Sequence, residues 1–140
     1  MIIGIGTDVV DVPLFRASLT DDIIGTRFLP GEIAYCEGRA RPWECFAARA
    51  AAKRAAARAL GMADELGLVA ELVRGNAGDV ELVLSGAALE AAVTLGATDW
   101  SVSIAHTKNT ALAVVVLESP DDCGIGDCRQ GTHERRKDGS

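Results

Sequence analysis

The stretch from Pro42 to Gly61 limits the possible folds of this chain more than any other feature. Nine of its twenty residues are alanine, the residue with the highest intrinsic helix propensity. A proline is well accommodated in the first turn of a helix, and a glycine commonly follows the last turn. We therefore predict one long helix over residues 42–61, whose small side chains allow close approach of neighbouring backbone.

Runs rich in β-branched residues predict strands on either side of this helix. Residues 1–12 predict a first strand that ends close to Asp8, and its Gly4 and Gly6 would let another backbone approach. The remaining pattern predicts a hairpin within 66–84, last strands at Trp100–Ala105 and Thr110–Leu117, and shorter helices at 13–18, from Pro30 and at 86–95. The sum is an α+β fold in which an antiparallel sheet wraps on the long helix.

Length and composition predict one soluble domain. The chain has 140 residues, 49% of them hydrophobic, and no apolar run approaches the roughly 18 residues of a membrane span. The first residues lack the basic segment of a secretory signal, so we expect a cytoplasmic protein. Few apolar residues follow Glu118, which predicts a domain over 1–118 and a disordered tail over 119–140. The net charge of −6 argues against a nucleic-acid partner.

Four cysteines raise the question of disulfides or a zinc site. Cys36 and Cys45 fall in a helical region and Cys123 and Cys128 in the tail, and a cytoplasmic chain is kept reduced, so we interpret all four as free thiols. The last two have only His133 nearby and lack the second cysteine pair of a tetrahedral zinc site. We therefore expect neither a disulfide nor bound zinc.

Three short segments carry the strongest functional signal. They are Gly4-Ile-Gly-Thr-Asp8, Arg49-Ala-Ala-Ala-Lys53-Arg54-Ala55 and Ser101-Val-Ser-Ile-Ala-His106-Thr-Lys108. In order and separation they resemble the G-I-G-x-D, R-F-A-A-K-E-A and S-I-S-H-T-K motifs of the holo-acyl-carrier-protein synthase family, the 4'-phosphopantetheinyl transferases. The resemblance covers residues 1–118. It implies the phosphopantetheinyl transferase-like fold, a homotrimer with active sites shared between subunits, and an acyl carrier protein or carrier domain as partner.

One departure from these motifs bears on the chemistry. Arg54 stands where the family has a Glu that holds magnesium together with the Asp of the first motif, which is Asp8 here. One aspartate and one arginine are neutral together, as are two carboxylates and a divalent cation, so we expect an ion pair between Asp8 and Arg54. A guanidinium grips phosphate but does not activate an attacking alkoxide as a metal does. We therefore expect magnesium binding at Asp8 to be weak or absent.

The resemblance also assigns site residues. Asp8, Lys53, Arg54 and His106 are the candidate catalytic residues, with Asp8 and His106 as acid and base in a reaction that needs no metal. Coenzyme A or a phosphopantetheine thioester is the expected ligand, and its expected contacts are Arg49, Lys53, Arg58, Gly61, His106, Thr107 and Lys108. Without the resemblance, Asp8 reads as an ordinary strand-end residue and the basic side of the long helix as a solvated face.

Three functions follow from these observations. The replaced Glu favours a repurposed homologue that acts without magnesium on an acyl or polyketide intermediate linked to coenzyme A or phosphopantetheine, by dehydration, isomerisation or cyclisation, in fatty acid or polyketide-type biosynthesis. The alternative is a working transferase that moves the phosphopantetheine arm of coenzyme A to a carrier-protein serine. A third is a non-catalytic subunit that binds a carrier protein. The fold alone does not choose among them.

Overall fold

A computed structural model describes residues 1–63, 67–74 and 79–120 of the chain. Its α-helices are α1 (Val12–Ser18), α2 (Asp21–Arg27), α3 (Pro30–Glu37), α4 (Pro42–Leu60) and α5 (Gly86–Leu95). Its strands are β1 (Ile2–Asp11), β2 (Ala70–Arg74), β3 (Val80–Leu84), β4 (Asp99–His106) and β5 (Thr110–Glu118), and a 3-10 turn spans Gly67–Val69.

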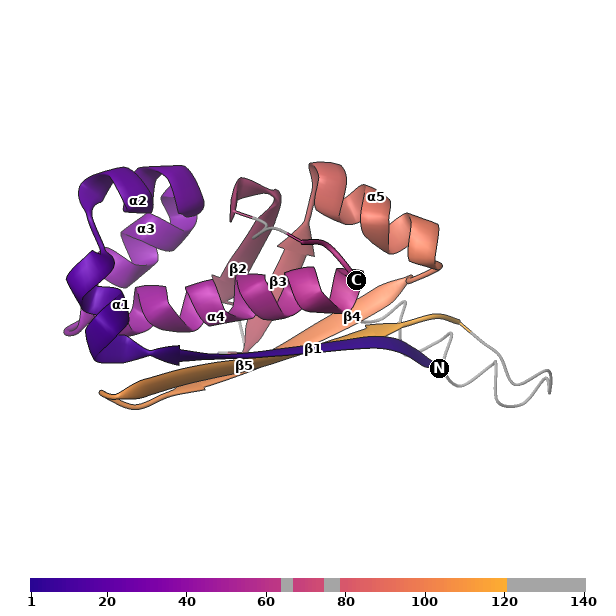
Figure 1. Ribbon diagram of the computed structural model, residues 1–140. Coiled ribbons are helices and arrows are strands. Elements are labelled where there is room, and N and C mark those ends of the chain that lie inside the picture. Colours follow the sequence, from indigo (N-terminus) through magenta and orange to yellow (C-terminus); the bar gives the residue numbers. More distant parts are fainter. Residues whose placement is uncertain (64–66, 75–78, 121–140) are drawn as a thin grey trace.

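The strands form two antiparallel sheets rather than one. Strands β1, β5 and β4 make a three-stranded sheet in that order, and β2 pairs with β3. Helix α4 lies along one face of the larger sheet, α1 to α3 gather at one of its ends, and α5 lies toward the other (Figure 1). The indole Nε1 of Trp100 on β4 donates a hydrogen bond of 2.9 Å to the carbonyl of Leu82 on β3, which joins the two sheets. The predicted α+β fold, with an antiparallel sheet against one long helix, is confirmed.

Helix α4 is the centre of the hydrophobic core. Fifteen of its nineteen residues are buried, which its many alanines allow because they need little space on any side. Gly61 ends the helix in the left-handed conformation, at φ 73°, as a C-cap glycine does. The predicted basic surface of this helix is only partly correct, since Arg49 and Lys53 are buried while Arg54 and Arg58 reach solvent.

Two glycines of β1 let the strand lie directly against α4. A Cβ atom on Gly4 would lie 2.9 Å from the carbonyl oxygen of Ala59, and one on Gly6 would clash with the carbonyl oxygen of Ala55. The close backbone approach expected of these glycines is therefore present. It fixes the distance between β1 and the helix, and hence the position of Asp8 two residues beyond Gly6.

Some element boundaries differ from those predicted. Strand β1 continues to Asp11 because β5 pairs with it without interruption from Gly4 to Asp11. Helix α2 was not predicted, although its signals are present: the Thr20 hydroxyl accepts a hydrogen bond from the amide of Ile23, and Asp21 and Asp22 occupy the first turn.

The interpretation of every cysteine as a free thiol is wrong for two of them. Cys36 on α3 and Cys45 on α4 form a disulfide, with Cα atoms 5.4 Å apart. Both cysteines belong to a buried cluster with Phe28, which precedes α3, and Phe46 on α4, whose ring centroids lie 4.9 Å apart. Cys123 and Cys128 lie outside the described residues.

The predicted tail also falls largely outside the described residues, which end at residue 120. Ser119 still belongs to the domain, since its amide and carbonyl both bond to Met1. Among the described residues, no helix combines the length and apolar character that crossing a membrane would require.

Candidate active site

Asp8 forms a cluster with two arginines of α4. Its position in β1 turns its side chain toward the helix, and that side chain is 3% exposed. Oδ1 of Asp8 lies 2.9 Å from Nη1 of Arg58, and Oδ2 lies 3.4 Å from Nε of Arg54. The expected ion pair between Asp8 and Arg54 is thus present, although Oδ2 receives no well-directed hydrogen bond.

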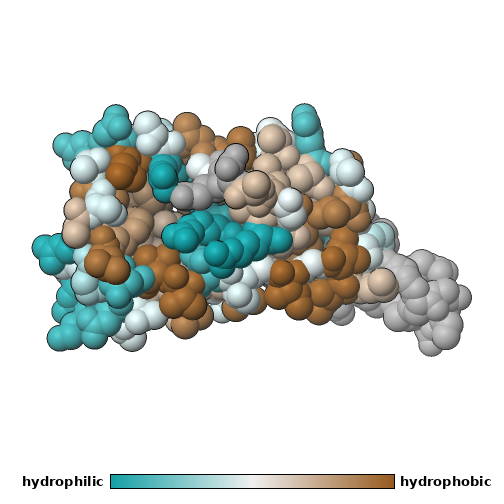
Figure 2. Space-filling view, in the orientation of Figure 1, coloured by the Kyte–Doolittle hydropathy of each residue, from teal (hydrophilic) through white to brown (hydrophobic). Residues whose placement is uncertain are grey.

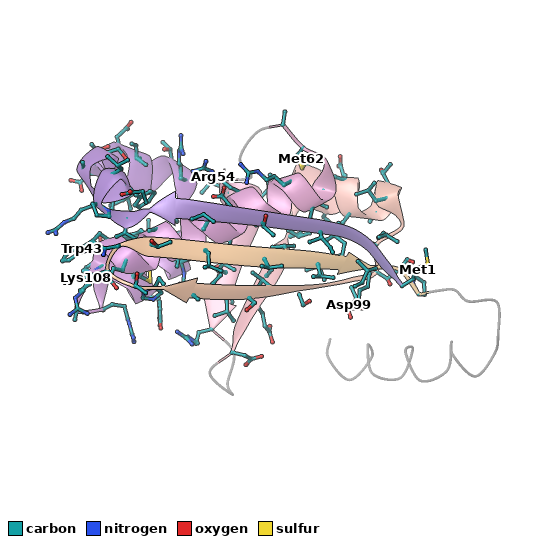
Figure 3. All side chains as sticks on the ribbon, turned by 60° about the horizontal axis from the view of Figure 1, so that its bottom comes forward. Met1, Trp43, Arg54, Met62, Asp99 and Lys108 are labelled. Atoms are coloured by element: carbon teal, nitrogen blue, oxygen red, sulfur yellow. A yellow bond between two sulfur atoms is a disulfide. The ribbon has the colours of Figure 1, made fainter. Side chains whose placement is uncertain are left out.

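The two guanidinium groups line an open cavity of about 750 Å³. The side chains of Arg54 and Arg58 are 42% and 57% exposed, and Arg27 from the end of α2 also lines the cavity. Figure 2 shows a hydrophilic patch in the middle of this face, over α4, and Figure 3 places Arg54 above β1 on the same side as Met62, another lining residue. Three cations around one cavity suit a multiply charged anion such as pyrophosphate.

Lys53 lies differently from the phosphate contact that we expected. Its Nζ donates hydrogen bonds to Oε1 of Glu32 at 2.7 Å and to the carbonyls of Arg27 and Gly67 at 2.8 and 2.9 Å. The ammonium group has three hydrogens, and all three are used. Burial lowers the pKa of Lys53, and the hydrogen bond and charge of Glu32 oppose that effect only in part. Lys53 therefore connects two lining residues of the cavity, Arg27 and Gly67, through their carbonyl groups.

A second basic cavity, of about 140 Å³, lies between α3, α4 and β4. At its wall the ring of Tyr35 is surrounded by Arg39, Arg49 and Arg74, whose guanidinium carbons lie 5.3, 4.7 and 5.4 Å from the ring centroid. Arg74 also donates a 2.7 Å hydrogen bond to the Tyr35 hydroxyl. Partial burial raises the pKa of Tyr35. That hydrogen bond and the three positive charges lower it by more, so the net pKa is below the ordinary value of 10.0.

His106 borders the same cavity at the end of β4. Its Nδ1 lies 3.2 Å from Oε1 of Glu44, a carboxylate whose side chain is 7% exposed. Thr107 shapes the turn to β5, since its hydroxyl accepts hydrogen bonds from the amides of Asn109 and Thr110. Lys108 lies in the turn between β4 and β5, at one end of the sheet (Figure 3).

The predicted site residues therefore fall into two groups. Arg54 and Arg58 line the larger cavity and both pair with buried Asp8, whereas Arg49 and His106 border the smaller one. The two cavities share no lining residue, and Gly61 lines neither. Six further residues of the two cavities and their walls were not among the predicted site residues: Tyr35, Arg39, Arg74, Glu44, Glu32 and Arg27. Arg27, Glu32 and Tyr35 lie within one segment, 26–36, which resembles a further stretch of the family, whereas Arg39, Glu44 and Arg74 come from separate segments. Glu32 was also expected in the first turn of a helix, and its Oε1 does accept from the amide of Leu29.

The residues around Asp8 do not fit a magnesium ion. Magnesium prefers oxygen ligands in an octahedron, and here each oxygen of Asp8 faces a guanidinium nitrogen instead. Glu32 does not supply a second carboxylate ligand, because its oxygens already accept from Lys53 and from the amides of Leu29 and Leu72. Across the described part of the chain, no three acidic, histidine or cysteine side chains are grouped to hold a metal ion.

Sequence comparison identifies close relatives. The chain is 38% identical over 124 residues to a holo-[acyl-carrier-protein] synthase of Koribacter versatilis and 43% identical over 124 residues to one of Solidesulfovibrio magneticus. Each match covers 84% of this chain and 99% of the relative. No protein-family model matches the chain.

Solved structures agree with these relatives. The holo-[acyl-carrier-protein] synthase of Neisseria meningitidis superposes with a TM-score of 0.74 at 28% identity, covering 85% of this chain and all of that one. The enzyme of Bacillus anthracis, solved in complex with coenzyme A (3',5'-ADP), superposes with a TM-score of 0.70 at 29% identity, covering 85% and 98%. With three motifs, the fold and relatives of matching length in agreement, the chain belongs to the holo-acyl-carrier-protein synthase family of transferases.

Proposed function

We propose that this chain transfers the 4'-phosphopantetheine arm of coenzyme A to a serine of an acyl carrier protein or carrier domain. The observation that carries the proposal is the cavity of Arg27, Arg54 and Arg58 beside buried Asp8, in a chain whose relatives are named for this activity. These names favour transfer over dehydration, isomerisation or cyclisation. The same names favour transfer over a role limited to binding a carrier protein.

The proposed step displaces one oxygen at phosphorus by another. The serine oxygen forms a bond to the phosphorus that carries the pantetheine arm, and the bond from that phosphorus to the bridging oxygen breaks, so that 3',5'-ADP leaves with its electron pair. The arginines stabilise the negative charge that develops on the phosphate oxygens. The serine proton passes to solvent, which reaches the cavity beside the partly exposed Arg54 and Arg58.

The smaller basic cavity suits the other anionic end of coenzyme A, its 3'-phosphate. Arg39, Arg49, Arg74 and His106 supply four potential donors there. Nδ1 of His106 lies 3.2 Å from Oε1 of Glu44, a contact that fixes the ring at the border of this cavity. Because the two cavities share no residue, we propose that one coenzyme A spans a cavity on each of two neighbouring copies.

The outer face of the larger sheet supports such an assembly. On the side away from α4, the paired residues of the three strands carry no charge over three successive rows: Ile5–Val116–Ser101, Thr7–Val114–Ser103 and Val9–Leu112–Ala105. Ile5, Val9 and Leu112 are exposed in the single chain. An uncharged, partly apolar sheet face of this kind is typical of a surface that is covered, and we propose a homotrimer. Sedimentation equilibrium tests the stoichiometry, with Val9→Glu expected to dissociate the assembly and Leu14→Glu, on exposed α1, to preserve it.

Conversion of an apo carrier protein tests the proposed reaction. Intact-mass spectrometry should show the carrier protein gaining one phosphopantetheine group when it is incubated with coenzyme A and this chain. Asp8→Asn should slow the transfer by about tenfold or more, since a charge-assisted hydrogen bond is worth about 1.5–3 kcal/mol. Glu90→Gln on exposed α5 is the matched control and should be as active as the unchanged chain. Absence of any mass gain over a panel of carrier proteins would contradict the proposal.

A further inference from the structure

The cluster around Asp8 carries an excess of positive charge. Asp8 contributes one negative charge, and Arg54 and Arg58 contribute two positive charges within 3.4 Å of its oxygens. A divalent cation bound to Asp8 would have to displace these groups or lie beside them, at a distance where like charges repel. An anion is attracted instead, because it neutralises the excess positive charge.

Asp8 determines which guanidinium nitrogens of Arg54 and Arg58 are left to bind a ligand. Arg58 uses Nη1 for both Asp8 and the carbonyl of Thr7, at 2.7 Å, and Arg54 approaches Asp8 through Nε. None of the described residues accepts a hydrogen bond from the terminal nitrogens of Arg54 or from Nη2 of Arg58. Both side chains line the 750 Å³ cavity, so these donors are available to a ligand there. Asp8 orients the two guanidinium groups instead of ligating a metal.

We infer that Arg54 replaces the divalent cation in this chain, and that the site binds the pyrophosphate of coenzyme A through guanidinium groups without metal. The inference rests on the proposed function in taking coenzyme A as the ligand. A planar guanidinium matches two phosphate oxygens at once, which a second carboxylate at position 54 would repel unless a cation lay between them. Asp8 is then a positioning residue, and its loss weakens binding in the absence of any metal.

Binding of coenzyme A, measured by calorimetry apart from any transfer, tests the inference. The unchanged chain should bind coenzyme A with the same affinity, within about twofold, in chelator and in millimolar magnesium. Arg54→Glu should bind about tenfold or more weakly in chelator and recover when magnesium is added, because the new pair of carboxylates can hold the ion. Arg54→Lys keeps the charge but not the planar fork and should fall between them.

Manganese provides a second readout that needs neither coenzyme A nor transfer. Electron paramagnetic resonance should detect no manganese binding to the unchanged chain and binding to Arg54→Glu, with circular dichroism showing that the variant is folded. A chain that binds coenzyme A only weakly in chelator, or about tenfold more tightly with magnesium, overturns the inference. If coenzyme A binds without metal but no carrier protein is modified, the proposed function fails and this inference stands. If the carrier protein is modified only when magnesium is present, the proposed function stands and this inference fails.

Discussion

The Nζ atom of Lys53 lies 2.7 Å from Oε1 of Glu32, in an ion pair whose side chains are only 3% and 0% exposed. Removing one partner of such a pair leaves the other charge buried and unpaired. Lys53→Met should therefore lower the free energy of unfolding by about 3–5 kcal/mol in urea titrations. Arg41→Met is the matched control, because Arg41 is 65% exposed in its pair with Glu44 and should matter by less than about 1 kcal/mol. Equal losses in the free energy of unfolding for the two variants would contradict the larger contribution expected of the buried pair.

Gly6 should tolerate no larger residue. Gly6→Ala would place a methyl group against the carbonyl oxygen of Ala55, and neither backbone can move without separating β1 from α4. We expect a loss of about 3 kcal/mol or more of stability, the upper end of the range for overpacked cores. Gly25→Ala on α2 is the control, since nothing lies within 4 Å of the added Cβ and alanine favours a helix by about 0.5–1 kcal/mol. Thermal unfolding of both variants measures the contrast, and a stable Gly6→Ala variant would contradict the close approach.

Local sequence signals predicted the elements that depend on few distant contacts. Helix α4 follows from its alanines between Pro42 and Gly61, and the strands follow from their β-branched residues. The pairing of Asp8 with Arg54 was predictable because two motifs placed both residues at one site and their charges are opposite.

Burial of the basic residues on α4 was not predictable in the same way. Lys53 is buried because Glu32, 21 residues earlier, and two backbone carbonyls from other segments meet its ammonium group. Arg49 is buried against Tyr35 on α3. Helical periodicity shows which residues share a face, but which faces are covered depends on how the helices pack, and the same packing made the cysteine interpretation wrong.

The disulfide between Cys36 and Cys45 should contribute to stability. It links residues nine positions apart in the sequence. For a loop of this length the chain-entropy model gives a stabilisation of about 2–3 kcal/mol. In a Cys123→Ser, Cys128→Ser background, non-reducing peptide mapping should find the bridge, and a reductant should lower the unfolding midpoint. Adding Cys36→Ser and Cys45→Ser should remove the effect of the reductant. A fully reduced protein under oxidising conditions would contradict the pairing.

Tyr35 should ionise at lower pH in the folded chain than in the unfolded one. Arg74 donates to its hydroxyl and, with Arg39 and Arg49, favours the phenolate strongly enough to outweigh the effect of burial, so the pKa is below 10.0. Tyr35 is the only tyrosine, so the near-ultraviolet absorbance of phenolate reports this residue alone. We expect the midpoint of its titration to rise toward the ordinary value in denaturant and in Arg74→Met.

The sign of the effect on stability follows from the direction of this pKa shift. With a depressed pKa in the folded state, the unfolded chain retains the proton longer, so ionisation of Tyr35 adds stability as pH rises from the folded pKa to 10.0. That contribution is lost as pH falls back through the folded pKa. Tyr35→Phe should remove it, so the difference in stability between the unchanged chain and this variant should increase across that alkaline window. A difference that stays constant with pH would mean that the three arginines do not act on the phenol as their positions indicate.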